Sequence, residues 1–338
     1  MKPYEIGISP LGPSRMVKAA VRKAVRDINS KPRDAQERFE RLLFSQFGIG
    51  RNNLLLANSL KELMYAIPHA LQPRNVLIIG PAISLYRDAV RSAGARMEFL
   101  PGKEETGYLT DLSAFAAKIS GFDMVCVANP NRITGKAIDD RTLSGMVARL
   151  PDENCLLVID ETLMEFTRQK SFMERLPVMG NIIVLRTTAC YYGLAGLELA
   201  YAASSEAVIA ALRERTYWDL NLPAVVAART AMKDKAFSRL TDKFIDDEKH
   251  LLQRAVSKMQ GIGLYGSDAN VLLFKPHDCM AAVAQMAGKA GLAVERYAGP
   301  HGFDTPLLGI SIMRHEHNLR LIKIMQQVCR EKNSRVSG

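Results

Sequence analysis

Short runs of consecutive apolar residues alternate with helical patterns through the middle of this 338-residue sequence. Leu156-Leu157-Val158-Ile159 and Ile182-Ile183-Val184 are apolar at every position, which is typical of strands that are buried on both faces of a sheet. Because such strands, when separated by helices, form parallel sheets covered on both sides, the sequence predicts an α/β fold. Strands are expected at 53–57, 76–79, 96–100, 124–128, 155–160, 181–186 and 197–202, and helices at 60–70, 84–92, 111–119 and 139–150.

The two ends of the chain follow other patterns. An apolar stripe at helical spacing runs through residues 14–27, and a long amphipathic helix is expected after residue 235. It is followed by a strand at 271–274, a helix at 280–290, a strand at 307–313 and a helix that ends near residue 330. We therefore predict three parts: an N-terminal segment, 1–30, that packs with the small domain; a large domain, 31–235, with a mainly parallel seven-stranded sheet; and a small C-terminal α/β domain, 236–332.

Charge and cysteine content exclude several classes of protein. The net charge is +10, but the Lys and Arg residues are scattered, which favours a solvated basic surface over a nucleic-acid-binding site. The five cysteines form no CxxC pair, so we expect a reducing, cytoplasmic environment and no zinc site. His315-Glu316-His317 lacks further ligands nearby, and no metal is expected. Neither a secretory signal nor an apolar run of roughly 18–20 residues is seen, so no membrane association is expected.

One segment carries the most specific motif. Residues 185–201 read LRTTACYYGLAGLELAY. This resembles LRTFSKAFGLAGLRLGY, the cofactor-lysine segment of fold-type I pyridoxal-phosphate (PLP) enzymes of the histidinol-phosphate aminotransferase and threonine-phosphate decarboxylase group. In this alignment Cys190 stands at the Schiff-base lysine and Glu198 at the arginine that binds the cofactor phosphate. A thiol cannot form the imine, and a carboxylate repels a phosphate dianion.

Further segments resemble the same family in the same order. Residues 9–13 (SPLGP) resemble NPLGPP, 58–71 resemble the phosphate loop and helix of the decarboxylase type, and 128–135 (ANPNRITG) resemble ANPNNPTG. Residues 158–166 (VIDETLMEF) resemble VVDEAYIEF, and 267–270 resemble an SxAN strand. The resemblance therefore implies a fold-type I aminotransferase-like fold along nearly the whole chain.

The resemblance also assigns the positions of a cofactor site. Asn58 lies in the phosphate loop, and Asp160 takes the place of the acid that faces the pyridinium nitrogen. The altered positions are Lys61 in the phosphate loop, Ile83 for the ring-stacking aromatic, Arg132 and Leu163 for the donors to the ring oxygen, and Glu198. Because a buried unpaired carboxylate is costly, we expect Arg132 to pair with Asp160 and Lys61 to neutralise Glu198 within a largely polar cavity.

Cys190 has two interpretations. A nearby Arg132 would lower its pKa and favour a nucleophile. No histidine motif accompanies it, however, so a small residue in place of an unneeded lysine is the favoured interpretation. Trp218 lies where the family contacts its partner subunit, which suggests an aromatic interface anchor.

These substitutions lead to a functional hypothesis with one main alternative. We expect a protein that has lost PLP-dependent catalysis and needs no cofactor. It would act as a dimer, either with itself or with a lysine-bearing paralogue, and would bind an anionic small molecule. The alternative is an active aminotransferase or phospho-amino-acid decarboxylase that uses non-covalent PLP or a relocated lysine such as Lys61. A role in nucleic-acid binding through the net charge is the least favoured.

Overall fold

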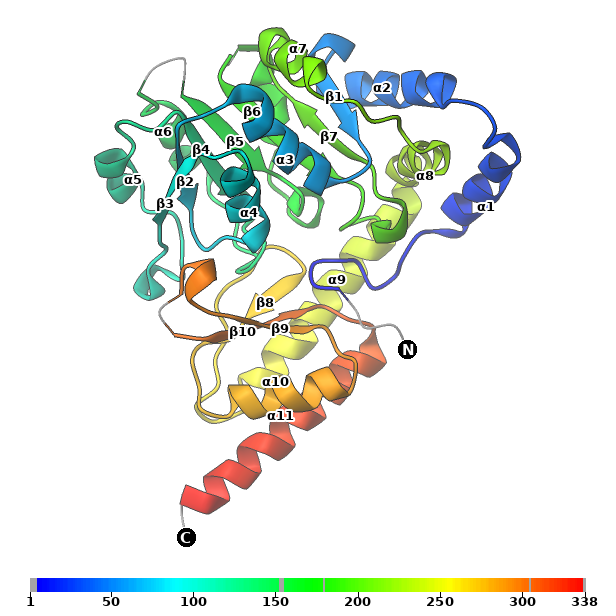
Figure 1. Cartoon of the computed structure of the whole chain (residues 1–338). Coiled ribbons are helices and arrows are strands. Elements are labelled where there is room, and N and C mark those ends of the chain that lie inside the picture. The colour runs from blue at the N-terminus through cyan, green and yellow to red at the C-terminus, as the bar shows by residue number, and fades with distance from the viewer. Residues whose placement is uncertain (1–4, 152–154, 179, 304, 337–338) are drawn as a thin grey trace.

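The computed structural model describes residues 5–151, 155–178, 180–303 and 305–336. Within these residues the chain forms a large domain and a small domain, and the long helix α9 (Lys235–Val256) runs from one to the other (Figure 1). None of the helices in these residues is long and apolar enough to cross a membrane.

The large domain contains a mixed sheet whose strands match the seven predicted ones. In the described residues its order is β1-β7-β6-β5-β4-β2-β3, and β7 runs antiparallel to β1 and β6 while the remaining pairs are parallel. The strands are β1 (Leu54–Ala57), β2 (Asn75–Ile79), β3 (Arg96–Leu100), β4 (Met124–Ala128), β5 (Leu156–Asp160), β6 (Ile182–Thr187) and β7 (Ala200–Ala203). The predicted fold class is confirmed.

Helices cover both faces of this sheet because its strands alternate their apolar side chains between the faces. Leu77 of β2 belongs to an apolar core that includes side chains of α2 (Arg33–Phe47), α5 (Leu112–Lys118), α6 (Asp140–Val147) and α8 (Leu222–Lys233). The next residue, Ile78, belongs to the core on the other face, which includes side chains of α3 (Leu60–Leu71), α4 (Ser84–Ser92) and α7 (Glu206–Glu214). The two strands that are apolar at successive positions, β5 and β6, therefore lie in the middle of a sheet that has helices on both faces.

The small domain has an antiparallel sheet in the order β8-β10-β9 within the described residues. It consists of β8 (Val271–Leu273), β9 (Val294–Tyr297) and β10 (Leu307–Ser311), and α9, α10 (Met280–Lys289) and α11 (His315–Val336) contribute to its core. The sequence did not predict β9. Glu295 and Arg296 at its centre are exposed, so this edge strand lacks the apolar run that marks a buried one.

The N-terminal segment contacts both domains. The Gly7 amide donates to Ser311 Oγ at 3.0 Å, and Arg314 Nε donates to the Pro10 carbonyl at 3.2 Å, so both of these contacts are with the small domain. Helix α1 (Arg15–Ala24) instead packs against α8 of the large domain. The three-part division at 1–30, 31–235 and 236–332 stays a prediction, since residues 1–4 are outside the described residues and the segment is shared between the domains.

Candidate functional site

Asp160 ends β5 at the carboxyl edge of the parallel strands, which is where ligands bind in open α/β sheets. Its side chain is 1% exposed. The Tyr86 hydroxyl donates to Asp160 Oδ2, and the Thr162 amide donates to Oδ1 at 2.9 Å. The buried carboxylate therefore has two internal donors.

Tyr86 is a site residue that the sequence analysis missed. It lies in α4 with Ala89 and Val90 on the buried side of the helix, so its spacing indicates only a core position. Burial, and then the negative charge and hydrogen bond of Asp160, raise the pKa of Tyr86 well above its ordinary value. Tyr86 thus stays a hydrogen-bond donor. The signal that was available is that a buried tyrosine hydroxyl needs an acceptor.

Arg132 acts on Asp160 through charge. It is partly buried in the loop after β4. Burial alone lowers the pKa of Arg132, but Cys190, Asp160, Tyr86 and Glu198 together raise it above its ordinary value. The expected pairing is corrected in one respect: among the described residues, Tyr86 and Thr162 make the hydrogen bonds of Asp160, and Arg132 supplies a nearby positive charge.

Cys190 lies in an apolar environment. It is 1% exposed and packs with Leu163 of the large domain and with Ala269 and Val271 of the small domain. Burial raises the pKa of the Cys190 thiol to about 12, while Arg132 acts in the opposite direction. The expectation of largely polar surroundings is therefore wrong on this side, because Leu163, Ala269 and Val271 pack around Cys190 with apolar surface.

Glu198 binds the N-terminus of α3. Its Oε1 atom accepts from the Leu60 amide at 3.0 Å and from the Thr187 hydroxyl at 2.5 Å. Lys61, the expected partner, is exposed, and its ammonium lies 6.0 Å from the centroid of the Tyr65 ring. The expected Lys61–Glu198 pairing is wrong because backbone and hydroxyl donors already satisfy this carboxylate.

The two remaining predicted positions, Asn58 and Ile83, contact other parts of the large domain. Asn58 Nδ2 donates to the Asp219 carbonyl at 3.0 Å, and Asn58 Oδ1 accepts from the Asn221 amide at 3.0 Å. The side chain of Asn58 thus holds the 219–221 segment against the start of α3. Ile83 precedes α4 and is partly buried between two apolar clusters. Their cofactor-binding roles stay predictions.

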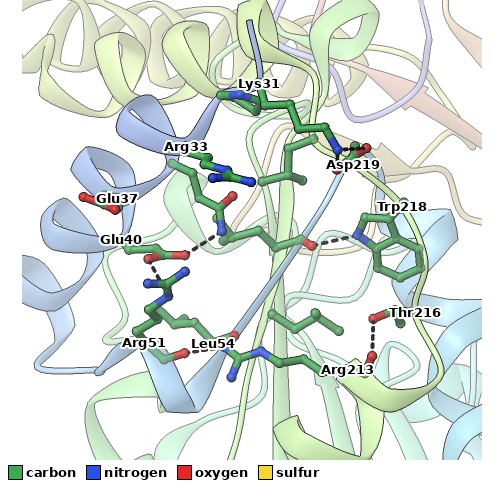
Figure 2. Close-up of a pocket in the computed structure, with 15 residues that line it drawn as sticks. Lys31, Arg33, Glu37, Glu40, Arg51, Leu54, Arg213, Thr216, Trp218 and Asp219 are labelled. Atoms are coloured by element: carbon green, nitrogen blue, oxygen red, sulfur yellow. Dashed lines mark hydrogen bonds and ion pairs between the residues drawn. The ribbon is translucent and has the colours of Figure 1, made fainter.

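A cavity of about 570 Å³ lies between α2, β1 and the segment that follows α7 (Figure 2). Trp218 Nε1 donates to the Leu56 carbonyl at 2.9 Å, and Arg213 donates to the Leu54 carbonyl at 2.7 Å. Lys31 pairs with Asp219 at its rim. Trp218 therefore covers the edge of β1 within its own chain. Among the described residues, neither Asp160 nor Cys190 lines this cavity, and no cluster of three or more metal-ligating side chains is found.

A mixed seven-stranded sheet, a small antiparallel domain and a buried acid at the end of β5 define an aminotransferase-like α/β protein. The chain belongs to the aminotransferase class I and II family, whose model matches residues 10–324.

Several relatives and solved structures are similar to this chain over most of its length. Histidinol-phosphate aminotransferase 2 from Carboxydothermus hydrogenoformans is 29% identical over 85% of this chain and 79% of its own. L-threonine-O-3-phosphate decarboxylase from Porphyromonas gingivalis has a TM-score of 0.82 at 18% identity, covering 97% of this chain and 99% of its own. Histidinol-phosphate aminotransferase from Sinorhizobium meliloti, in complex with pyridoxal-5'-phosphate, has a TM-score of 0.86 at 20% identity, covering 98% of this chain and 92% of its own.

These comparisons contradict the expectation that no cofactor is used. The chain belongs to a family whose members depend on PLP, and the Sinorhizobium meliloti structure contains it. The substitutions at Cys190 and Glu198 therefore do not justify excluding a cofactor.

The residues of the site fit the pyridine ring of PLP but not its phosphate. Asp160 is a buried acid of the kind that pairs with a pyridinium nitrogen. Beside it, the Thr162 hydroxyl is buried and has no hydrogen-bond partner among the described residues, which leaves a polar position for a ring ligand. The N-terminus of α3, however, binds the carboxylate of Glu198 where an anion would bind, and Cys190 offers no amine.

Proposed function

We propose that this chain is a PLP-binding protein of the histidinol-phosphate aminotransferase and threonine-phosphate decarboxylase type that holds the cofactor non-covalently. The observation that carries the proposal is the Asp160 carboxylate, buried at the end of β5 and held by Tyr86 and Thr162. When bound, PLP supplies an electron sink for carbanion chemistry. The relatives that cover most of the chain support this class of activity.

The chain's own residues would orient the ligand. Asp160 would hold the ring nitrogen, Tyr86 would keep the carboxylate in place, and Arg132 would attract the carboxylate or phosphate of a substrate. We favour non-covalent binding over an imine at Lys61, because Lys61 is exposed and lies against Tyr65.

A titration with PLP tests this proposal. We expect an absorbance change with wild-type protein that is lost in Asp160→Ala and kept in Asp247→Asn, which alters an exposed acid on α9. Borohydride reduction followed by peptide mass mapping should find no lysine adduct. An adduct on Lys61 would establish the relocated-lysine alternative instead, and a wild-type protein without any spectral change would contradict the proposal.

The buried thiol of Cys190 favours a second candidate function. Its thiol is buried and its pKa is raised to about 12, so it supplies neither an imine nor a thiolate at neutral pH. The chain would then be a dimeric ligand-binding or partner subunit without turnover of its own, and we expect either candidate to act in the cytoplasm. Absence of transamination of histidinol phosphate and of decarboxylation of threonine phosphate at saturating PLP would favour this candidate, as would co-purification of a lysine-bearing paralogue.

A further inference from the structure

We infer that Glu198 is an internal anion at the N-terminus of α3 that makes this site prefer uncharged ligand tails over phosphate esters. The inference rests on the proposed function for the identity of the ring ligand. Its structural basis is the pair of hydrogen bonds that Glu198 accepts from Leu60 and Thr187.

The Glu198 carboxylate occupies the position of a helix-bound anion. Leu60 is the first residue of α3, and the first amides of a helix point outward and carry partial positive charge. Glu198 Oε1 accepts from the Leu60 amide at 3.0 Å and from the Thr187 hydroxyl at 2.5 Å. Thr187 is itself fixed, because its Oγ1 accepts from the Ala189 amide at 3.1 Å.

Other amides at this helix end also have internal acceptors. The Glu62 amide donates to Ser59 Oγ at 3.2 Å, and the Asn58 amide donates to Glu62 Oε2 at 2.8 Å. This arrangement is close to a capping box. Three amides at this end of α3 are therefore already bound, and two carboxylates balance the positive end of the helix dipole.

The same geometry indicates which ligands fit. An arriving phosphate dianion would meet the charge of Glu198 and would have to displace it from Leu60 and Thr187. A ligand hydroxyl, by contrast, is a donor. Among the described residues both hydrogen bonds of Glu198 fall on Oε1, so Oε2 is available to accept from it. A pyridine ligand with a hydroxymethyl tail, such as pyridoxal, suits this site better than its phosphate ester.

The test compares wild type with Glu198→Gln, and uses Glu206→Gln as the matched control. Glutamine keeps an amide oxygen that can accept from Leu60 and Thr187, so the variant should fold. Glu206 is an exposed acid in the first turn of another helix, α7. Inorganic phosphate, compared with chloride at equal ionic strength, should raise the melting temperature of Glu198→Gln and leave wild type and Glu206→Gln unchanged.

Ligand titrations provide the second readout. We expect Glu198→Gln to bind PLP about tenfold more tightly than wild type, with little change for pyridoxal. Equal PLP affinity in wild type and Glu198→Gln, or an equal response of both to phosphate, would overturn the inference and leave the proposed function standing. If no variant binds PLP or pyridoxal but phosphate stabilises Glu198→Gln alone, the proposed function fails and the role of Glu198 stands.

Discussion

The thiol of Cys190 shows how burial can outweigh charge at one residue. Leu163, Ala269 and Val271 enclose it, and its pKa is raised to about 12 although the guanidinium of Arg132 acts to lower it. The sequence suggested the nearby cation but not the apolar enclosure, because Ala269 and Val271 come from the other domain. The nucleophile interpretation is therefore the weaker of the two.

Alkylation of Cys190 by iodoacetamide should reflect this raised pKa. Because only the thiolate reacts, we expect slow modification near neutral pH and a rate that rises with pH toward about 12 without reaching a plateau near 9.0, the ordinary value for a thiol. Peptide mass spectrometry at several pH values measures the rate, and the urea-unfolded chain provides the ordinary profile. A plateau near neutrality in the folded protein would show an activated thiolate instead.

How far the site could be predicted differs from one residue to the next. Asp160 was identified because residues 158–166 resemble the family segment that carries the acid facing the pyridinium nitrogen. Tyr86 was not, because its helical spacing is that of a core residue. The partner assigned to Glu198 was wrong because charges suggest a lysine, whereas the structure uses a backbone amide and a hydroxyl, which have no charge signature in a sequence.

At the scale of elements, the loop after β4 joins the two domains at Gly135. The Asp268 and Ala269 amides both donate to the Gly135 carbonyl, at 2.9 and 3.1 Å. Gly135 has a φ of +69°, and a Cβ there would lie 2.2 Å from Ser267 Oγ and 2.8 Å from the Val271 carbonyl oxygen. The close approach of the two backbones therefore requires glycine.

Gly135→Ala should destabilise the protein much more than Gly48→Ala. Gly48 has the same φ of +69° but nothing within 4 Å of a Cβ, so it isolates the backbone cost of about 1 kcal/mol. Gly135→Ala adds a clash with backbone atoms, and we expect a total loss of about 3 kcal/mol. Urea unfolding followed by circular dichroism measures both. Equal losses would show that the loop moves aside without cost.

The elements themselves were largely predictable, and the exceptions share a cause. Most strands of the large sheet were found because they carry a compact apolar run, as β5 and β6 do. β9 was missed because Glu295 and Arg296 are exposed at an edge. The N-terminal segment was expected to pack with the small domain, and the sequence did not indicate that its helix α1 also packs on α8. Periodicity reveals which face of an element is buried but not which neighbour covers it.

At the scale of the whole molecule, several large apolar side chains between residues 16 and 44 are exposed. Met16 is 59% exposed, Ile28 63% and Phe44 60%, and α1 and α2 lie on the same side of the large domain (Figure 1). Exposed apolar side chains can belong to an interaction surface. We expect them to contribute to a dimer interface, with Trp218 fixing the nearby edge of β1.

Substitution of Phe44 tests this surface. Phe44→Asp should shift the protein from dimer to monomer in light scattering, because an interface cannot bury an unpaired carboxylate without cost. Leu240→Asp is the control, since Leu240 is 55% exposed on α9, away from α1 and α2 in sequence. A monomeric wild-type protein, or equal dissociation of both variants, would contradict the assignment of the interface.

Helix α9 gives the molecule a mechanical property. Its 22 residues form one uninterrupted helix about 33 Å long, which starts beside α8 and ends in the core of the small domain. If the helix moves as a rigid body, a tilt of about 5° at Lys235 would displace its far end by about 3 Å. Leu272 of β8 packs in the same core as that end of the helix, and the preceding residue, Val271, packs with Cys190. A small tilt at the large-domain end of α9 would therefore shift Val271 against Cys190, where the two domains pack together.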